Sequence, residues 1–136
     1  MSAADIVRAY LAAMEARDLA VAQALLAPEF TMQFPGPVTF TKLAELIEWA
    51  KPRYRFVHKR YERFDEAPIA DNTAAGGAVV YCYGTLAGEW PDGTAFAGIR
   101  FIDRFAVVNG LLAGQTVWND LAEYRQNNAA LSPNKA

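Results

Sequence analysis

The sequence has little sulfur and little histidine, and both shortages narrow the chemistry that it supports. Cys82 is its one cysteine and His58 its one histidine. A single thiol excludes an internal disulfide and a thiolate metal cage, and one imidazole among scattered carboxylates predicts no metal site. Cys82 lies within an apolar run, so we interpret it as a core residue and not as a nucleophile.

Long apolar runs and a strong net charge are missing as well. No segment reaches the roughly 20 apolar residues that a membrane-spanning helix needs, and the first residues do not resemble a secretion signal. The net charge is -2 over 136 residues, of which 53% are hydrophobic and 21% charged. This composition predicts one globular domain, cytoplasmic by default, and argues against a membrane or a nucleic acid as the partner.

Positive charge is nevertheless concentrated in one segment. Six of the 13 lysines and arginines lie within residues 51–63, interleaved with aromatic residues. Such a mixture can bind single-stranded nucleic acid. Four of these side chains share one strand parity, which favours the solvated face of an amphipathic strand instead; they are Arg53, Arg55, Lys59 and Arg63.

Helical patterns occupy the first third of the sequence, and strand patterns occupy the rest. The predicted helices cover residues 3–16, 19–26 and 42–51, with a short strand over 29–34, and Ser2, Asp18 and Thr41 serve as helix caps. Four longer strands are predicted over residues 53–64, 78–90, 94–108 and 111–118, and Asn109-Gly110 is a strong hairpin signal. Helices followed by an antiparallel meander predict an α+β fold whose sheet curls around the helices. We expect a single domain over residues 1–126 and a flexible tail over 127–136.

The most informative residue is Asp103, a lone carboxylic acid in an apolar row. Ile99, Phe101, Phe105 and Val107 point to the same side of the predicted strand. If this row faces an enclosed space, desolvation raises the pKa of Asp103 and lets it donate a hydrogen bond to a substrate oxygen. If it faces a partner subunit, an ion pair with an arginine there explains it equally well.

Two segments resemble the nuclear transport factor 2-like superfamily, which includes ketosteroid isomerases and SnoaL-like polyketide cyclases. In the opening segment, residues 8–19, Tyr10 occupies the place of an oxyanion-donating tyrosine of the isomerases. In Ile102-Asp103-Arg104-Phe105, which precedes the Asn109-Gly110 hairpin, Asp103 matches their second donor. The resemblance covers residues 3–125 and implies a cone-shaped, curved antiparallel sheet packed on three N-terminal helices, a cystatin-like roll.

The resemblance also implies a general base, and that position differs here. Phe34 stands where the isomerases carry an aspartate, and it cannot accept a proton. His58 is the candidate replacement because its unperturbed pKa suits proton transfer, and its parity with apolar neighbours leads us to expect that it faces inward. A core histidine that is merely hydrogen-bonded, for example to Glu62, is the alternative. Asp120 is either a helix cap or a second candidate base.

The sequence therefore predicts a small-molecule enzyme, an isomerase, dehydratase or cyclase, that acts on an apolar, oxygen-bearing substrate without a cofactor. Asp103 and Tyr10 polarise a carbonyl or hydroxyl, and His58 moves a proton. Aromatic side chains line the cavity: Phe34, Tyr54, Phe56, Phe101 and Trp118. The alternative is a non-catalytic module for ligand binding or dimerisation that has lost its base. A sheet face rich in arginine and aromatic residues favours a homodimer.

Overall fold

A computed structural model describes residues 1–69 and 77–125, so the predicted tail lies outside the described residues. The helices are α1 (Ala3–Glu15), α2 (Leu19–Ala24) and α3 (Leu43–Ala50). The strands are β1 (Leu26–Phe34), β2 (Val38–Phe40), β3 (Phe56–Pro68), β4 (Ala78–Glu89), β5 (Ala95–Val108) and β6 (Leu111–Asn119). A short helical turn covers residues 121–125. None of the helices within the described residues has the length and apolarity to span a membrane.

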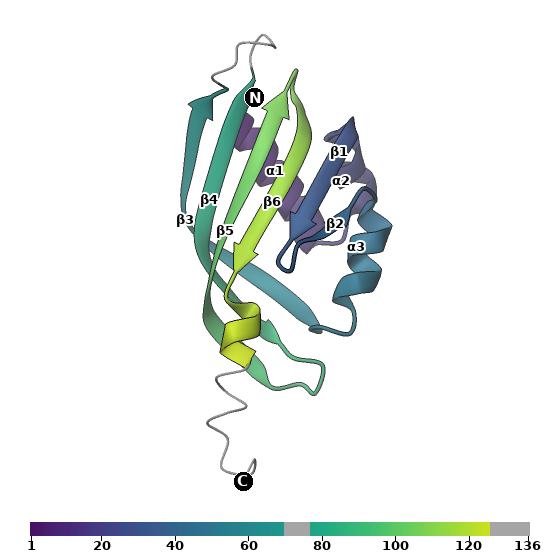
Figure 1. The fold of residues 1–136 in the computed structure, drawn as a ribbon, viewed down its shortest axis with the longest axis vertical. Helices are drawn as coiled ribbons and strands as arrows, with labels where there is room; N and C mark the ends of the chain where they lie inside the picture. The colour runs from purple at the N-terminus through teal and green to yellow at the C-terminus, as the bar shows by residue number, and fades with distance from the viewer. Residues whose placement is uncertain (70–76, 126–136) are drawn as a thin grey trace.

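The strands form one six-stranded sheet in the order β2-β1-β6-β5-β4-β3 (Figure 1). The antiparallel pairing of β3 with β4, β4 with β5 and β5 with β6 confirms the predicted meander. β1 instead runs parallel to β6 and forms a hairpin with β2, a strand that the sequence did not predict. The fold is the predicted α+β arrangement with a curved sheet.

Local signals explain most of the helix starts. The Ser2 hydroxyl accepts the Asp5 N–H and the Asp5 carboxylate accepts the Ser2 N–H, which confirms the capping box at α1. The assignment of Thr41 as the cap of α3 is wrong, because the helix begins one residue later, after Lys42. The Glu45 carboxylate accepts the N–H groups of both residues, so an acidic side chain inside the helix fixes this terminus.

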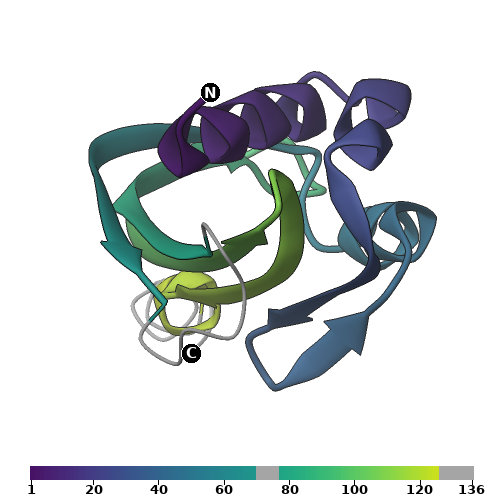
Figure 2. The same ribbon diagram turned by 90° about the horizontal axis from the view of Figure 1, so that it is seen from above.

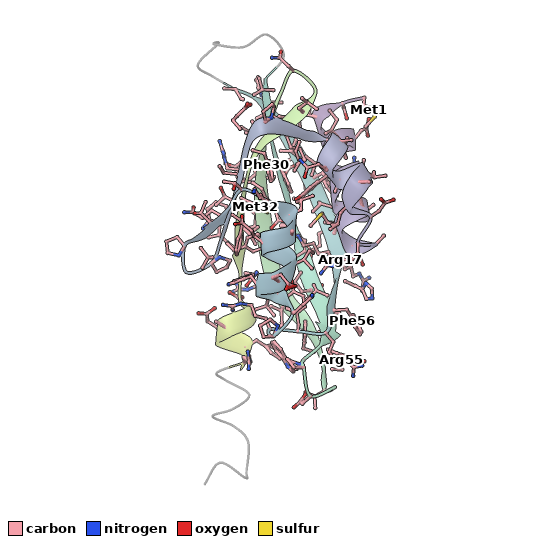
Figure 3. The ribbon with its side chains drawn as sticks, turned by 90° about the vertical axis from the view of Figure 1, so that its right-hand side faces the viewer. Met1, Arg17, Phe30, Met32, Arg55 and Phe56 are labelled. Carbon is pink, nitrogen blue, oxygen red and sulfur yellow. The ribbon has the colours of Figure 1, made fainter. Side chains whose placement is uncertain are left out.

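The sheet curls until α1 lies across its concave side (Figure 2). The predicted inward row of β5 is buried there: Ile99, Phe101, Asp103, Phe105 and Val107. Tyr10 of α1 packs against Phe105, with ring centroids 6.0 Å apart, and against Phe30 of β1, at 6.1 Å. Phe30 and Met32 of β1 are also buried in this core (Figure 3).

One-residue bulges decide which side chains of β3 and β6 face inward. In β3 the register with β4 shifts between Tyr61 and Arg63. In β6, Gly114 pairs with Ala106 whereas Leu112 pairs with Val107, so Ala113 has no partner in β5. Each extra residue exchanges the inward and outward rows of the strand beyond it.

Glycine permits the close approach of β3 and β4 where the sheet curls. A Cβ atom on Gly84 would lie 1.9 Å from the carbonyl oxygen of Arg60, and one on Gly88 would lie 2.1 Å from that of Phe56. Both distances are far inside van der Waals contact. Glycine within a strand is thus required here by the neighbouring backbone.

Candidate functional site

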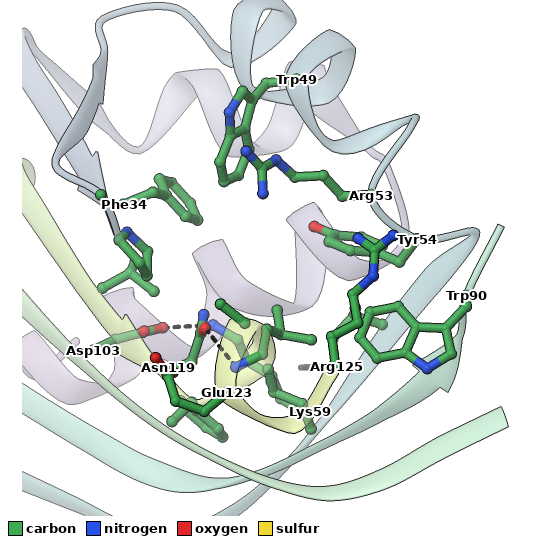
Figure 4. Close-up of a pocket in the computed structure, with 18 residues that line it drawn as sticks. Phe34, Trp49, Arg53, Tyr54, Lys59, Trp90, Asp103, Asn119, Glu123 and Arg125 are labelled. Atoms are coloured by element: carbon green, nitrogen blue, oxygen red, sulfur yellow. Dashed lines mark hydrogen bonds and ion pairs between the residues drawn. The ribbon is translucent and has the colours of Figure 1, made fainter. Parts of the chain in front are cut away.

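The concave side of the sheet holds a cavity of about 780 Å³ (Figure 4). A smaller lobe of about 110 Å³ adjoins it, and four residues line both spaces: Phe34, Tyr54, Val57 and Lys59. The remaining wall of the main cavity is formed by Pro35, Gly36, Trp49, Arg53, Leu86, Trp90, Phe101, Asp103, Val117, Asn119, Leu121, Ala122, Glu123 and Arg125. A mostly apolar cavity with a few polar groups is typical of small-molecule sites of this size.

Lys59 and Asp103 form an ion pair in the wall of this cavity. Lys59 Nζ donates to Asp103 Oδ2 at 2.5 Å, and the Lys59 side chain is 21% exposed whereas that of Asp103 is fully buried. Lys59 Nζ also lies 4.9 Å from the centroid of the Phe101 ring, at cation–π distance. Because desolvating two charges offsets much of their attraction, a buried pair is weak evidence for stability. Its place in a cavity favours a functional role.

The pKa of Asp103 is raised, in the direction that the sequence predicted. Burial raises the pKa of the Asp103 carboxyl, and the adjacent Lys59 ammonium lowers it by a smaller amount. The ion-pair partner in the structure is a lysine of the same chain. Asp103 Oδ1 has no hydrogen-bond partner within residues 1–69 and 77–125. This oxygen is therefore free to accept a proton or a hydrogen bond from a ligand.

Tyr10 lines the small lobe and is 1% exposed. Burial, and then the nearby Asp103 carboxylate, raise the pKa of the Tyr10 hydroxyl above its ordinary value, so it remains protonated and able to donate. Tyr10 Oη has no hydrogen-bond partner in the part of the chain that the structure describes. The two positions that match the isomerase donors are thus both buried, Asp103 in the wall of the main cavity and Tyr10 in the wall of the small lobe.

The SnoaL-like domain family matches residues 7–115, which run from α1 into β6 and include both residues of the ion pair. The chain belongs to the SnoaL-like family. None of the curated proteins shows significant sequence similarity to it.

Solved structures share the fold of this SnoaL-like domain at low sequence identity. A protein of unknown function described as NTF2-like, from Burkholderia pseudomallei, is 19% identical, with a TM-score of 0.73 and coverage of 90% of this chain and 93% of that one. A putative polyketide cyclase from Pseudomonas putida is 18% identical, with a TM-score of 0.64 and coverage of 93% and 97%. TerC, crystallised with polyporic acid, is 14% identical, with a TM-score of 0.73 and coverage of 90% and 94%.

Three of the predicted aromatic residues lie in the cavity wall of the SnoaL-like domain: Phe34, Tyr54 and Phe101. The ring centroids of Phe34 and of Trp49 on α3 lie 5.4 Å apart. The Arg53 guanidinium stacks on the Trp49 ring, 3.9 Å from its centroid. Trp49 and Arg53 form one side of the cavity, opposite Asp103 (Figure 4). A planar apolar ligand would find an aromatic wall here.

The expectation that His58 faces inward is wrong. The His58 side chain is 64% exposed, and its Nδ1 lies 2.5 Å from Glu15 Oε1 of α1. Phe56, in the same row of β3, is 39% exposed and lies at the edge of the molecule (Figure 3). Trp118 is 49% exposed, because the bulge at Ala113 turns it to the outer face of the sheet. His58, Phe56 and Trp118 therefore lie outside the cavity wall.

The sequence pattern did not predict that Lys59 and Gln115 face inward. Lys59 was assigned to a solvated row, although Val57 and Tyr61 flank it there, and an isolated cation between apolar residues was the available signal. Gln115 of β6 is 6% exposed, and its Oε1 has no partner among the described residues. No sequence pattern singled it out.

The contacts of Asp120 and the burial of Cys82 indicate structural roles for both residues. The Asp120 carboxylate pairs with Arg100 Nε at 2.5 Å, while Asn119 Oδ1 accepts the Leu121 N–H at the start of the terminal turn. Cys82 is fully buried, and burial raises its pKa to about 12, which confirms it as a core thiol. Within the described ranges no three His, Cys, Asp or Glu side chains are grouped as a metal site would need.

Proposed function

We propose that this SnoaL-like protein is an enzyme that transfers a proton on an apolar, carbonyl-bearing small molecule without a cofactor. The observation that carries the proposal is the Lys59–Asp103 pair in the cavity, with Asp103 Oδ1 unpaired among the described residues and the pKa of its carboxyl raised. The apolar cavity of about 780 Å³ supports a ligand of this kind. The name of the Pseudomonas putida relative, a putative polyketide cyclase, supports the same class of substrate.

The chemistry follows from three side chains: a carboxylate, an ammonium group and a hydroxyl. Because His58 is exposed, we assign the base to Asp103, which the sequence predicted as a donor. Asp103 Oδ1 accepts the proton of a carbon next to the substrate carbonyl, and the electron pair of the broken C–H bond forms an enolate. The Lys59 ammonium and the Tyr10 hydroxyl donate hydrogen bonds to the enolate oxygen, where negative charge develops. In an isomerisation the proton then returns from Asp103 to another carbon. In a cyclisation the enolate carbon attacks an internal carbonyl, the π electrons of that carbonyl move to its oxygen, and the resulting alkoxide takes the proton from Asp103.

Hydrogen–deuterium exchange of 2-tetralone in D₂O tests this proposal. We expect the wild-type protein to accelerate exchange of the hydrogens on the carbon between the aromatic ring and the carbonyl. Proton NMR measures this exchange as loss of their signal. Asp103→Asn should lower the protein-dependent rate by about 100-fold or more, because a positioned base contributes on the order of 10²–10⁴. Tyr10→Phe should lower it by about 100-fold, the effect of one lost oxyanion donor. His58→Gln is the matched control and should leave the rate unchanged, since His58 is exposed.

A non-catalytic ligand-binding module is the second candidate, and Phe34 favours it. The residue at this position packs against Phe40 and Trp49 and cannot accept a proton. The same experiment separates the two candidates when tryptophan fluorescence reports binding of 2-tetralone. Binding without accelerated exchange, or exchange that survives Asp103→Asn, would contradict the enzyme proposal.

We further propose that the outer face of the sheet forms a homodimer. Ile102 and Trp118 are exposed and directly opposite each other on β5 and β6, and Tyr81 is exposed on the adjacent β4. Apolar side chains gathered on one sheet face are typical of an interface between copies. Sedimentation equilibrium should show a dimer for the wild type and a monomer for Trp118→Glu. Val21→Glu, at an equally exposed apolar residue of α2, should remain dimeric; a monomeric wild type would contradict the proposal.

A further inference from the structure

We propose that the small lobe is a subsite that selects a hydroxyl group next to the reacting oxygen of the substrate, and that Gln115 is the residue that recognises it. The inference deepens the proposed function, because it places the reacting oxygen at Lys59 and Tyr10. Gln115 Oε1 then accepts a hydrogen bond from an adjacent substrate O–H. The substrate class is a carbonyl compound with a neighbouring hydroxyl or enol.

The fold brings Gln115 and Tyr10 together around one aromatic ring. Gln115 of β6 pairs in register with Phe105 of β5, and both side chains are buried on the concave face. The Tyr10 ring packs edge-on to the same Phe105, with centroids 6.0 Å apart. Tyr10 and Gln115 accordingly line the same lobe of about 110 Å³.

Both residues present a polar atom that the rest of the described protein does not satisfy. Tyr10 Oη and Gln115 Oε1 have no hydrogen-bond partner within residues 1–69 and 77–125, whereas nearly all buried polar side-chain atoms in proteins are paired. Gln115 is only 6% exposed. An amide that is buried and unpaired destabilises the fold, so the structure alone gives no reason to retain it.

The charged side chains of the lobe are already engaged. Arg17 Nη1 donates to the carbonyl oxygen of Met14 at 2.6 Å. Glu15 binds the exposed His58, and Lys59 binds Asp103. Two buried side-chain atoms of the lobe have no partner among the described residues: the Tyr10 hydroxyl, which can donate, and the Gln115 carbonyl oxygen, which can accept. Since the lobe is small, the two substrate groups that meet them must be close neighbours on the ligand.

Naphthols provide the test, because they are fluorescent, apolar and available with hydroxyls at defined spacings. We expect 2,3-dihydroxynaphthalene or 1,3-dihydroxynaphthalene to bind the wild type about 10-fold more tightly than 2-naphthol, the value of one neutral hydrogen bond. 3-Methoxy-2-naphthol, which lacks the second donor, and 2,7-dihydroxynaphthalene, whose second hydroxyl is remote, should show no gain. Gln115→Leu should abolish the preference and retain the affinity for 2-naphthol.

A second measurement separates recognition from a structural role. Gln115→Leu removes a buried amide oxygen that has no partner among the described residues, so we expect the Tm to rise. A lower Tm combined with an unchanged preference would make Gln115 a structural residue and overturn the inference. Equal affinities for all naphthols in the wild type would overturn it as well.

The outcome is independent of the exchange experiment on 2-tetralone. Accelerated exchange without a preference among the naphthols would remove the subsite and keep the enzyme. A preference that depends on Gln115 without accelerated exchange would keep the subsite and remove the catalytic role of Asp103.

Discussion

Replacing Lys59 and Asp103 together by apolar residues is expected to give a protein at least as stable as the wild type, whereas each change alone destabilises it. Lys59→Met leaves the Asp103 carboxyl buried without a counter-charge. Removing one member of a buried pair costs about 3–5 kcal/mol, and replacing both with apolar side chains is neutral or stabilising by about 1–4 kcal/mol. Because Lys59 is partly exposed, Asp103→Val should cost less than Lys59→Met.

The pH dependence of Lys59→Met provides the sharper signature. The pKa of Asp103 is raised in the folded protein, and loss of Lys59 raises it further. A group with a raised folded pKa contributes stability below its unfolded pKa and loses it as pH rises through the folded pKa. Lys59→Met should therefore be less stable at pH 8 than at pH 5. The double variant should lack this component of the pH dependence.

Denaturant unfolding of the four proteins at pH 5 and pH 8 measures both effects in one double-mutant cycle. If the double variant is clearly less stable than the wild type, the ion pair contributes net stability relative to apolar residues, and its presence in the cavity needs no functional explanation. A double variant that is stable yet inactive in the 2-tetralone exchange would show that the pair is retained for chemistry.

Gly84→Ala is expected to have the second large effect, on the shape of the sheet. Its Cβ would lie 1.9 Å from the Arg60 carbonyl oxygen, which is a backbone atom and cannot rotate away. The two strands must separate, and overpacking of this kind typically costs about 1–3 kcal/mol or more. Because β3 carries Lys59, the displacement should also weaken naphthol binding. Thermal unfolding and fluorescence titration measure the two effects.

Gly114→Ala is the matched control for this change. Gly114 is also a strand glycine, in β6, and its Cβ would lie 3.8 Å from the Thr31 carbonyl oxygen, an ordinary contact. Alanine there should be neutral or stabilising by about 0.4–1 kcal/mol, because it restricts the unfolded chain. Equal losses for the two variants would mean that the sheet responds to any added Cβ and not to this close approach.

In strand β5, sequence periodicity is sufficient to predict which side chains are buried. The alternation around Asp103 holds from Ile99 to Val107 without interruption, and every member of the row is buried. The direction of the pKa shift of Asp103 followed from this row alone. The helix boundaries were also close, since caps such as the one at Ser2 depend on only a few neighbouring residues.

Strands β3 and β6 show where periodicity fails. Tyr61 and Phe64 are neighbours, with ring centroids 4.9 Å apart, although three positions separate them in the sequence. The bulge between them means that Phe64 lies inside while His58, with the same parity, lies outside. Trp118 was predicted to line the cavity because it is a large aromatic residue, and the bulge at Ala113 places it on the outer face. Tertiary curvature selects such bulges, so a local pattern does not reveal them.

The bulges also bear on how such a cavity can diverge. Inserting or deleting one residue within a strand exchanges the entire set of side chains that a ligand meets, although no amino acid in that strand is substituted. A protein lineage can thus acquire a different binding surface in a single genetic event. Alignments of SnoaL-like sequences that admit gaps only in loops would then equate residues on opposite faces of the sheet, so that an outward histidine would be counted as the counterpart of an inward lysine.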